Sequence, residues 1–193
     1  SNFTFLNGKK TFFASDIGPG NTLIDEFCYK NFNKIYDFNG NLAKKGKIKF
    51  ELIDLWLKNK IFFRKFPTSF DIQDFNFINS RHYKTYSTYD ILRTLTFFSA
   101  KLISMIKMSI NFKIDSWVFS GGGVNNSLLM SDIKKLLIND KISISNSLGY
   151  DSSFVESAAF AYISIRTLKK LPSAFPKTTG CIKENVCGNI YIP

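Results

Sequence analysis

The sequence predicts an α/β domain with a mixed sheet, in which some neighbouring strands are antiparallel and others are parallel. Two observations carry this prediction. Two runs rich in aromatic and β-branched residues, 3–6 and 9–14, flank Asn7-Gly8, a dipeptide typical of the tight turn of a β-hairpin. Later in the chain, residues 117–145 have the order strand, loop, helix, strand, which connects parallel strands.

The individual elements follow from the apolar periods of the sequence. The later unit is expected to contain a short buried strand, a glycine loop, a helix and a second strand, at 117–119, 120–123, 126–138 and 142–145. Further segments have the period of amphipathic helices, at 22–33, 48–59, 87–109 and 153–171.

Two of these helices have apolar stripes that we assign to the core. The helix over 87–109 begins with Ser87-x-x-Asp90, a sequence typical of a helix N-terminus, and its stripe is Ile91, Leu95, Phe98, Leu102 and Ile106. The last helix is expected to bury Val155, Ala158, Ala159, Tyr162 and Ile163.

Composition limits the class of protein. A chain of 193 residues that is 45% hydrophobic is one domain, or one half of a two-lobed protein. No apolar run approaches the ~18 residues of a membrane helix, so no membrane partner is expected. The net charge of +11 raises nucleic acid as a partner, but the basic residues are scattered in pairs instead of forming a stripe. We therefore expect no nucleic-acid partner.

The cysteines and the histidine argue against two kinds of site. Cys28, Cys181 and Cys187 form no C-x-x-C pair, and His82 is the only histidine. A structural zinc site and a histidine-activated nucleophile are therefore unsupported, and no metal ligands are assigned. Reduced thiols in a cytoplasmic protein are the expectation.

Three glycines, Gly121, Gly122 and Gly123, lie between a strand and a helix. Backbone without side chains lets amide N–H groups approach phosphate or ribose oxygens, aided by the positive end of the helix dipole. The alternative is a tight strand-to-helix turn without a ligand, because the loop matches neither common phosphate-binding glycine motif.

Two carboxylates are candidates for chemistry. Asp16 follows a strand and precedes Gly18-Pro19-Gly20. The carboxyl ends of strands are where open α/β sheets bind ligands, which makes Asp16 a candidate general base. The alternative is a turn residue whose carboxylate accepts from the next backbone amides. Glu156 is a candidate substrate contact, and the alternative is that Ser153-x-x-Glu156 forms a capping box.

Taken together, these segments resemble the anhydro-N-acetylmuramic acid kinases, sugar kinases of the acetate kinase, sugar kinase, Hsp70 and actin superfamily. The resemblance rests on the order and spacing of motifs along nearly the whole chain. The matching segments are 15–25 (S-D-I-G-P-G-N-T-L-I-D), 37–47, 67–69, 90–100, 120–130 (beginning S-G-G-G-V-N-N), 149–171 (containing V-E-S-A-A-F-A) and 171–180.

The resemblance also implies an architecture. The chain corresponds to about the carboxyl half of the family, whose members begin with a G-T-M-S-G-T-S phosphate loop, so an amino-terminal lobe is expected to be missing. Residues 1–171 are then the second lobe of a two-lobed kinase, of the ribonuclease-H-like (actin-like ATPase) kind. Residues 172–193 are expected to form a tail that packs toward the missing lobe, and a homodimer is expected for the full-length protein.

The function that the resemblance implies is ATP-dependent phosphorylation of 1,6-anhydro-N-acetylmuramic acid, an amino sugar from cell-wall turnover, with ATP and Mg²⁺ as cofactors. Asp16 matches the family's catalytic aspartate, the base that activates the water that opens the anhydro ring. Substrate binding is expected at Glu156, Gly18 and Asn21, and nucleotide binding at Gly121, Gly122, Gly123 and Asn125.

The chain departs from the family at two positions near its middle. Thr68 stands where many members have a lysine, and Ile72 stands where a basic residue is common. Two alternatives follow from the sequence: an inactive remnant of such a kinase, or a basic nucleic-acid-binding α/β domain.

Overall fold

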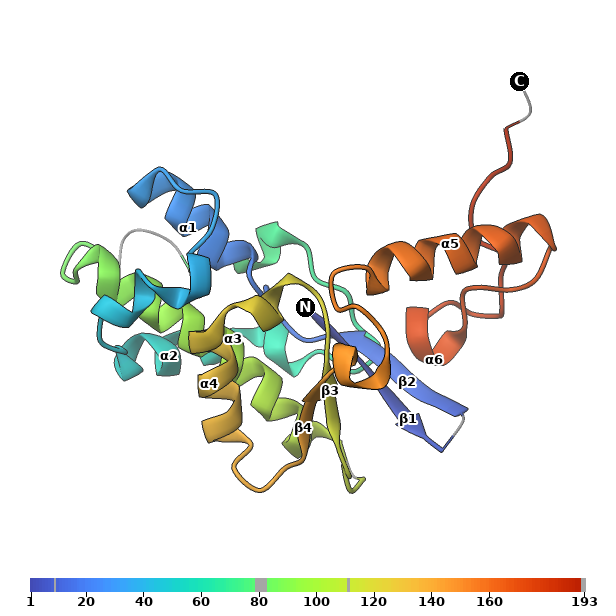
Figure 1. Cartoon of the computed structure of the whole chain (residues 1–193), viewed down its shortest axis with the longest axis horizontal. Helices are drawn as coiled ribbons and strands as arrows, with labels where there is room; N and C mark the ends of the chain where they lie inside the picture. Colours follow the sequence, from blue (N-terminus) through green and yellow to red (C-terminus); the bar gives the residue numbers. More distant parts are fainter. Residues whose placement is uncertain (9, 79–82, 111, 192–193) are drawn as a thin grey trace.

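The structure is a computed structural model, and it describes residues 1–8, 10–78, 83–110 and 112–191. The single histidine, His82, lies outside these residues, as does Lys9 in the expected hairpin. A group of packed helices lies on one side of the molecule, with α5 and α6 on the other side (Figure 1). Among the described residues, no helix is both long and apolar enough to cross a membrane.

The predicted hairpin is confirmed. Strands β1 (Asn2–Asn7) and β2 (Lys10–Asp16) pair antiparallel. Gly8 has a φ of +63°, which a glycine adopts without steric cost in the turn. The rings of Phe3 and Phe13 meet edge to face with their centroids 5.5 Å apart. The hairpin thus places Asp16 at the end of its second strand.

Four helices form the body of the molecule: α1 (Thr22–Phe32), α2 (Phe50–Leu57), α3 (Thr88–Ser109) and α4 (Ser127–Leu136). Helix α3 packs against each of the other three. Its predicted cap is confirmed, because the Ser87 hydroxyl accepts from the Asp90 N–H at 3.1 Å. The whole predicted stripe of α3 is buried. The described residues also form short 3₁₀ helices between the larger elements of the chain: η1 (Phe38–Gly40), η2 (Ala43–Lys45), η3 (Lys60–Phe63), η4 (Ile72–Phe75), η6 (Gly122–Asn125) and η7 (Ser145–Leu148).

One ion pair ties α3 to α4. The Arg93 guanidinium donates to both carboxylate oxygens of Asp132, at 2.5 and 2.8 Å. The side chains are only 12% and 3% exposed, respectively. A bidentate, desolvated pair of this kind fixes the orientation of the two helices.

The parallel unit is confirmed, although in a smaller form than expected. Strands β3 (Trp117–Phe119) and β4 (Ile142–Ile144) pair parallel. They form a two-stranded sheet separate from the hairpin, so the described strands make two small sheets instead of one mixed sheet. The expectation that 117–119 is a buried strand is wrong, because Val118 is 49% exposed. One face of this two-stranded sheet is therefore not covered at Val118.

The prediction for the last helix is right about its existence and wrong about its burial. Helix α5 (Val155–Leu168) is followed by the short α6 (Pro176–Thr179), which packs against β2. No residue of α5 is buried, and Tyr162, one of the residues assigned to the core, is 58% exposed. In Figure 1, α5 lies apart from the group of helices α1 to α4 that forms the core.

Candidate functional site

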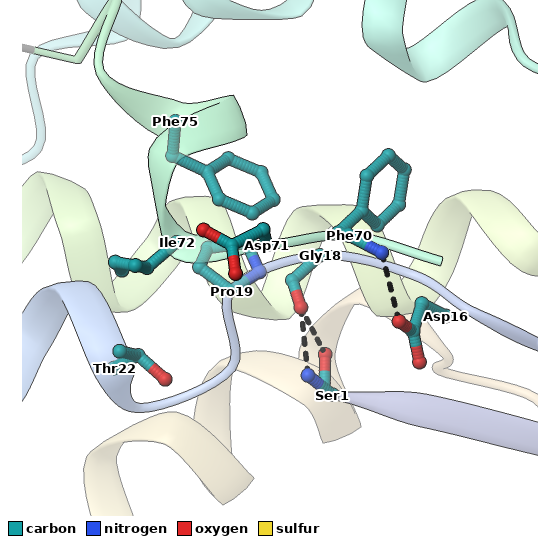
Figure 2. A pocket seen from close by; sticks show the side chains of 9 residues that line it. All are labelled: Ser1, Asp16, Gly18, Pro19, Thr22, Phe70, Asp71, Ile72 and Phe75. Carbon is teal, nitrogen blue, oxygen red and sulfur yellow. Dashed lines mark hydrogen bonds between the residues drawn. The ribbon is translucent and has the colours of Figure 1, made fainter. Parts of the chain in front are cut away.

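A small cavity lies where the end of β2 meets a segment from the middle of the chain. It has a volume of about 90 Å³, and Figure 2 shows the side chains around it. The lining residues are Ser1, Asp16, Gly18, Pro19, Thr22, Phe70, Asp71, Ile72 and Phe75. This space is large enough to hold water. It is much smaller than the ~300–1,000 Å³ of typical small-molecule pockets.

Asp16 is held at this cavity through one of its two carboxylate oxygens. Oδ2 accepts from the Phe70 N–H at 2.9 Å and from the Ser69 hydroxyl at 3.2 Å. Oδ1 accepts no hydrogen bond from any residue that the structure describes. The alternative of a turn residue bonded to the next backbone amides is therefore wrong, because its partners come from a segment more than fifty positions away. One oxygen fixes the carboxylate and the other is available to a water.

Helix α3 fixes the turn that carries Asp16. The Ser99 hydroxyl of α3 donates to the Gly20 carbonyl at 2.7 Å. Gly18 is buried so closely that an added Cβ would lie 2.5 Å from Leu102 Cδ1. Gly18 therefore shapes the wall of the cavity, and a larger residue here would require the Leu102 side chain to shift. Asn21, the other predicted substrate contact on this turn, does not line the cavity.

The segment that faces Asp16 is joined to β2 by reciprocal hydrogen bonds. The Thr68 N–H donates to the Ser15 hydroxyl at 2.9 Å, and the Asp16 N–H donates to the Thr68 carbonyl at 3.0 Å. The departures noted in the sequence thus lie at the site itself: Thr68 is beside the base, and Ile72 lines the cavity.

Sequence reasoning missed Phe70 and Asp71 as site residues. Asp71 begins η4 with a reciprocal cap, in which its carboxylate accepts from the Gln73 N–H at 2.9 Å and its N–H donates to Asp74. The spacing Asp71-x-x-Asp74 was the signal for this turn. Nothing in the local sequence indicates that the turn packs against the end of β2.

The glycine loop, residues 120–123, is open and accessible. Gly121 has a φ of +86°, and its N–H donates to the Ser152 carbonyl at 2.9 Å. An added Cβ on Gly121 or Gly122 would meet nothing within 4 Å. A tightly packed turn, the alternative to a ligand site, would explain Gly123, because an added Cβ there would have neighbours at van der Waals distance. It does not explain Gly121 or Gly122, which have none. Asn125 is exposed at the end of η6, which the loop begins.

Glu156 is exposed in the first turn of α5, and it is not part of a capping box. No side chain caps this helix, and the Ser153 N–H instead donates to the Asp151 carboxylate at 2.8 Å. Glu156 does not line the cavity beside Asp16.

A comparison with known families shows which family the chain matches. The model of the family described as "Anhydro-N-acetylmuramic acid kinase" matches residues 1–193, the whole chain. The chain belongs to this family. The α/β class, the hairpin that ends in Asp16 and the glycine loop are in keeping with the sugar kinase and actin-like ATPase fold of the anhydro-N-acetylmuramic acid kinase family.

Curated relatives carry the family's name. A protein of Rhodopseudomonas palustris is 33% identical over 93% of this chain and 48% of its own length. One of Clostridioides difficile is 34% identical over 92% of this chain and 48% of its own length, and one of Bacillus cereus is 33% identical over 93% and 50%. Each is named anhydro-N-acetylmuramic acid kinase. The chain spans about half the length of the curated relatives it matches.

Some residues that carried the resemblance to the anhydro-N-acetylmuramic acid kinases are structural. The buried Asp37 carboxylate accepts from the N–H groups of Leu42 and Ala43, at 2.8 and 2.9 Å, and so closes a turn. An added Cβ on Gly46 would lie 2.0 Å from the Tyr89 carbonyl oxygen. This family segment, 37–47, therefore fits against the start of α3 and does not reach the cavity.

Proposed function

We propose that this chain supplies the base and part of the nucleotide site of a kinase that phosphorylates 1,6-anhydro-N-acetylmuramic acid with ATP. The carboxylate of Asp16 is the observation that carries the proposal. One of its oxygens is fixed by Ser69 and Phe70, and the carboxylate lines a cavity of about 90 Å³. This is the geometry that a general base for water requires.

The proposed reaction is the one that the resemblance to the anhydro-N-acetylmuramic acid kinases implies. Asp16 accepts a proton from a water in the cavity while the water oxygen bonds to the anomeric carbon of the sugar. The bond from that carbon to the bridging oxygen breaks, and the released six-position oxygen takes the γ-phosphoryl group. The products are N-acetylmuramic acid 6-phosphate and ADP, and the proton on Asp16 returns to solvent. A positioned base of this kind contributes typically ~10²–10⁴-fold in rate.

The nucleotide fits the open face of the glycine loop. Gly121 and Gly122 leave space around their backbone. The Gly121 N–H already donates to the Ser152 carbonyl, so we assign the phosphate oxygens to the other N–H groups of the loop. Mg²⁺ commonly keeps several waters and binds through phosphates and one or two carboxylates. Among the described residues, no group of three acidic, histidine or cysteine side chains is placed to hold a metal ion. We therefore assign Mg²⁺ to the phosphates of ATP, whose charge it would neutralise when bound.

The cavity is too small for the sugar, so a second lobe is needed to complete the cleft. The apolar side chains of α5 and of the tail are exposed, including Phe160 at 70% and Tyr191 at 87%. We propose that this surface, which includes the tail 172–193, packs toward the half of the protein that the chain does not span. A homodimer of the whole protein is part of the same proposal, with the amino sugar and ATP as its ligands and no nucleic acid.

Reconstitution tests the proposal. The chain is co-expressed with the half of the Bacillus cereus relative that it does not match, and phosphorylation of the anhydro sugar is measured. We expect activity with the wild-type chain, a loss of about 10²-fold or more in kcat with Asp16→Asn, and unchanged ATP binding.

Asp71→Asn is the matched control. Asp71 lines the same cavity, and an asparagine side chain accepts the hydrogen bond from Gln73 equally well. Equal losses in the two variants would contradict the assignment of the base to Asp16. A complex that forms and shows no phosphorylation would instead favour the inactive remnant.

A further inference from the structure

The segment that holds Asp16 is itself held by Ser15, the residue of β2 that precedes the base. Ser15 is only 5% exposed. Its hydroxyl accepts from the Thr68 N–H at 2.9 Å and donates to the Thr68 carbonyl at 3.1 Å, so one side chain bonds both backbone groups of a residue 53 positions away. The Asp16 carbonyl oxygen is also 3.1 Å from this hydroxyl, whose single proton is shared between the two acceptors.

Aromatic rings anchor the same segment at both of its ends. Phe66 packs against Phe3 and Phe13 of the hairpin, with ring centroids 5.3 and 6.2 Å apart. Phe70 packs against Phe75, with ring centroids 5.6 Å apart. Apolar contacts bring the segment to the end of β2, but they are not directional and do not fix where a backbone N–H points. Hydrogen bonds are directional, so the register of the segment depends on its polar contacts.

The polar contacts between the segment and β2 form two groups. In the first, the backbone of Thr68 is bonded to the Ser15 hydroxyl and to the Asp16 N–H. In the second, Ser69 and Phe70 donate to the Asp16 carboxylate, and Figure 2 shows the bond from the Phe70 N–H. The first group fixes the backbone from which the second group holds the base.

We propose that Ser15 is a positioning residue for Asp16. Its hydroxyl fixes the backbone of Thr68, and this backbone sets the position of the Phe70 N–H that orients the carboxylate. The inference rests on the proposed function and deepens it, because Ser15 does not line the cavity and acts on the reaction only through the base. A misplacement of about 1 Å in a reacting group can lower a rate ~10²-fold.

The same contacts bear on the departure from the family at position 68. Thr68 stands where many members have a lysine. Its hydrogen bonds to Ser15 and Asp16 use only its backbone groups, which every residue type except proline offers. The positioning of Asp16 therefore does not depend on the side chain at position 68.

The first test is kinetic and uses the reconstituted kinase, the 193-residue chain with the unmatched half of the Bacillus cereus relative. Ser15→Ala removes the hydroxyl and leaves the packed rings in place. We expect kcat to fall about 10-fold to 100-fold. The KM for the anhydro sugar and the affinity for a non-hydrolysable ATP analogue should stay unchanged, because Ser15 contacts neither ligand in this proposal.

A double-mutant cycle separates positioning of the base from general stability. If Ser15 acts only through Asp16, Ser15→Ala causes no further loss of kcat in the Asp16→Asn background. A loss of equal size in both backgrounds would show that Ser15 only stabilises the fold, and the inference would be wrong.

Ser104→Ala is the matched control. Ser104 is a half-buried residue of α3, and its hydroxyl also donates to a backbone carbonyl, that of Lys101, at 2.7 Å. It does not line the cavity. We expect kcat, KM and the affinity for the ATP analogue to stay as in the wild type, which separates the role of Ser15 from the loss of any serine hydroxyl.

The second test needs no activity and uses the chain alone. Amide hydrogen exchange, followed by nuclear magnetic resonance, reports how often the Phe70 N–H leaves the Asp16 carboxylate. We expect the Phe70 amide to exchange about 10-fold to 100-fold faster in Ser15→Ala than in the wild type, with no change at the amides of α3. Ser104→Ala should leave the rate at Phe70 unchanged.

The remaining outcomes each give a definite answer. An unchanged exchange rate at Phe70 in Ser15→Ala would show that the rings alone fix the segment, and an unchanged kcat would give Ser15 no part in the reaction. A raised KM with an unchanged kcat would assign Ser15 to sugar binding. Each of these results overturns the inference. A wild-type complex without phosphorylation would instead overturn the proposed function, and the exchange rate at Phe70 would still decide whether Ser15 positions the carboxylate.

Discussion

Helices α3 and α5 are both rich in apolar residues, yet one is buried and the other is not. Phe98 of α3 is 0% exposed and lies among the rings of Trp56 and Phe62, whereas Phe160 of α5 is 70% exposed. Helix α3 has α1, α2 and α4 around it, whereas α5 lies apart from these helices. The comparison teaches that an apolar period shows which residues are suited to burial. A second surface is needed before they are buried.

The same substitution in the two helices gives the largest expected contrast. Phe98→Ala removes a fully buried ring and should lower the free energy of unfolding by about 4 kcal/mol, because transfer and cavity terms add. Phe160→Ala should change it by less than about 0.5 kcal/mol, because the ring is already in water. Urea unfolding of the chain, followed by circular dichroism, measures both.

The contrast would disappear if α5 had a covered apolar face in solution. A large loss for Phe160→Ala in the chain alone would therefore show that α5 packs against something, such as a second copy. In the reconstituted complex, by contrast, we expect the effect of Phe160→Ala to grow, since the other half is proposed to cover this helix.

The ion pair inside the body gives the next largest effect. Arg93→Ala leaves the Asp132 carboxylate buried and unpaired, which should cost about 3 kcal/mol of unfolding free energy. Lys30→Ala, which removes an exposed pair with Glu26, should cost less than about 0.5 kcal/mol. A double variant that replaces both Arg93 and Asp132 with methionine should recover most of the loss. Failure to recover would mean that the pair has a role beyond mutual neutralisation.

The cysteines also differ in burial between the helical body and the tail. Burial raises the pKa of the Cys28 thiol to about 12, while Cys181 and Cys187 in the tail are half-buried. We expect thiol-reactive reagents at pH 8 to label Cys181 and Cys187, and to label Cys28 only after unfolding. Mass spectrometry of the labelled peptides measures this. Rapid labelling of Cys28 under native conditions would show that the body opens locally.

The same thiol makes a small contribution to the pH dependence of stability. An unfolded thiol loses its proton near pH 9, and the folded Cys28 near 12. Between these values the folded state binds more protons, so the free energy of unfolding falls as the pH rises. Urea unfolding at pH 8 and pH 10 should show a larger fall for the wild type than for Cys28→Ala. An equal fall in both would contradict the shifted thiol.

Local signals predicted most of the elements. Asn7-Gly8 marked the hairpin turn, Ser87 marked the start of α3, and the apolar stripe of α3 predicted its burial. The candidate site was predicted in part. The position of Asp16 at a strand end and the openness of Gly121 were expected, but the partners of Asp16 were not. Those partners depend on contacts between distant segments, which a local pattern does not record.

The sequence by itself determined the class of the protein, the family motifs, the start of α3 and the place of Asp16 at the end of a strand. These follow from backbone preferences and side-chain periods within a few residues of one another. Only the tertiary structure decided that residues 68–70 hold Asp16 and that α5 is uncovered. The reason is physical: hydrogen-bond partners and burial are set by which distant segments share one space.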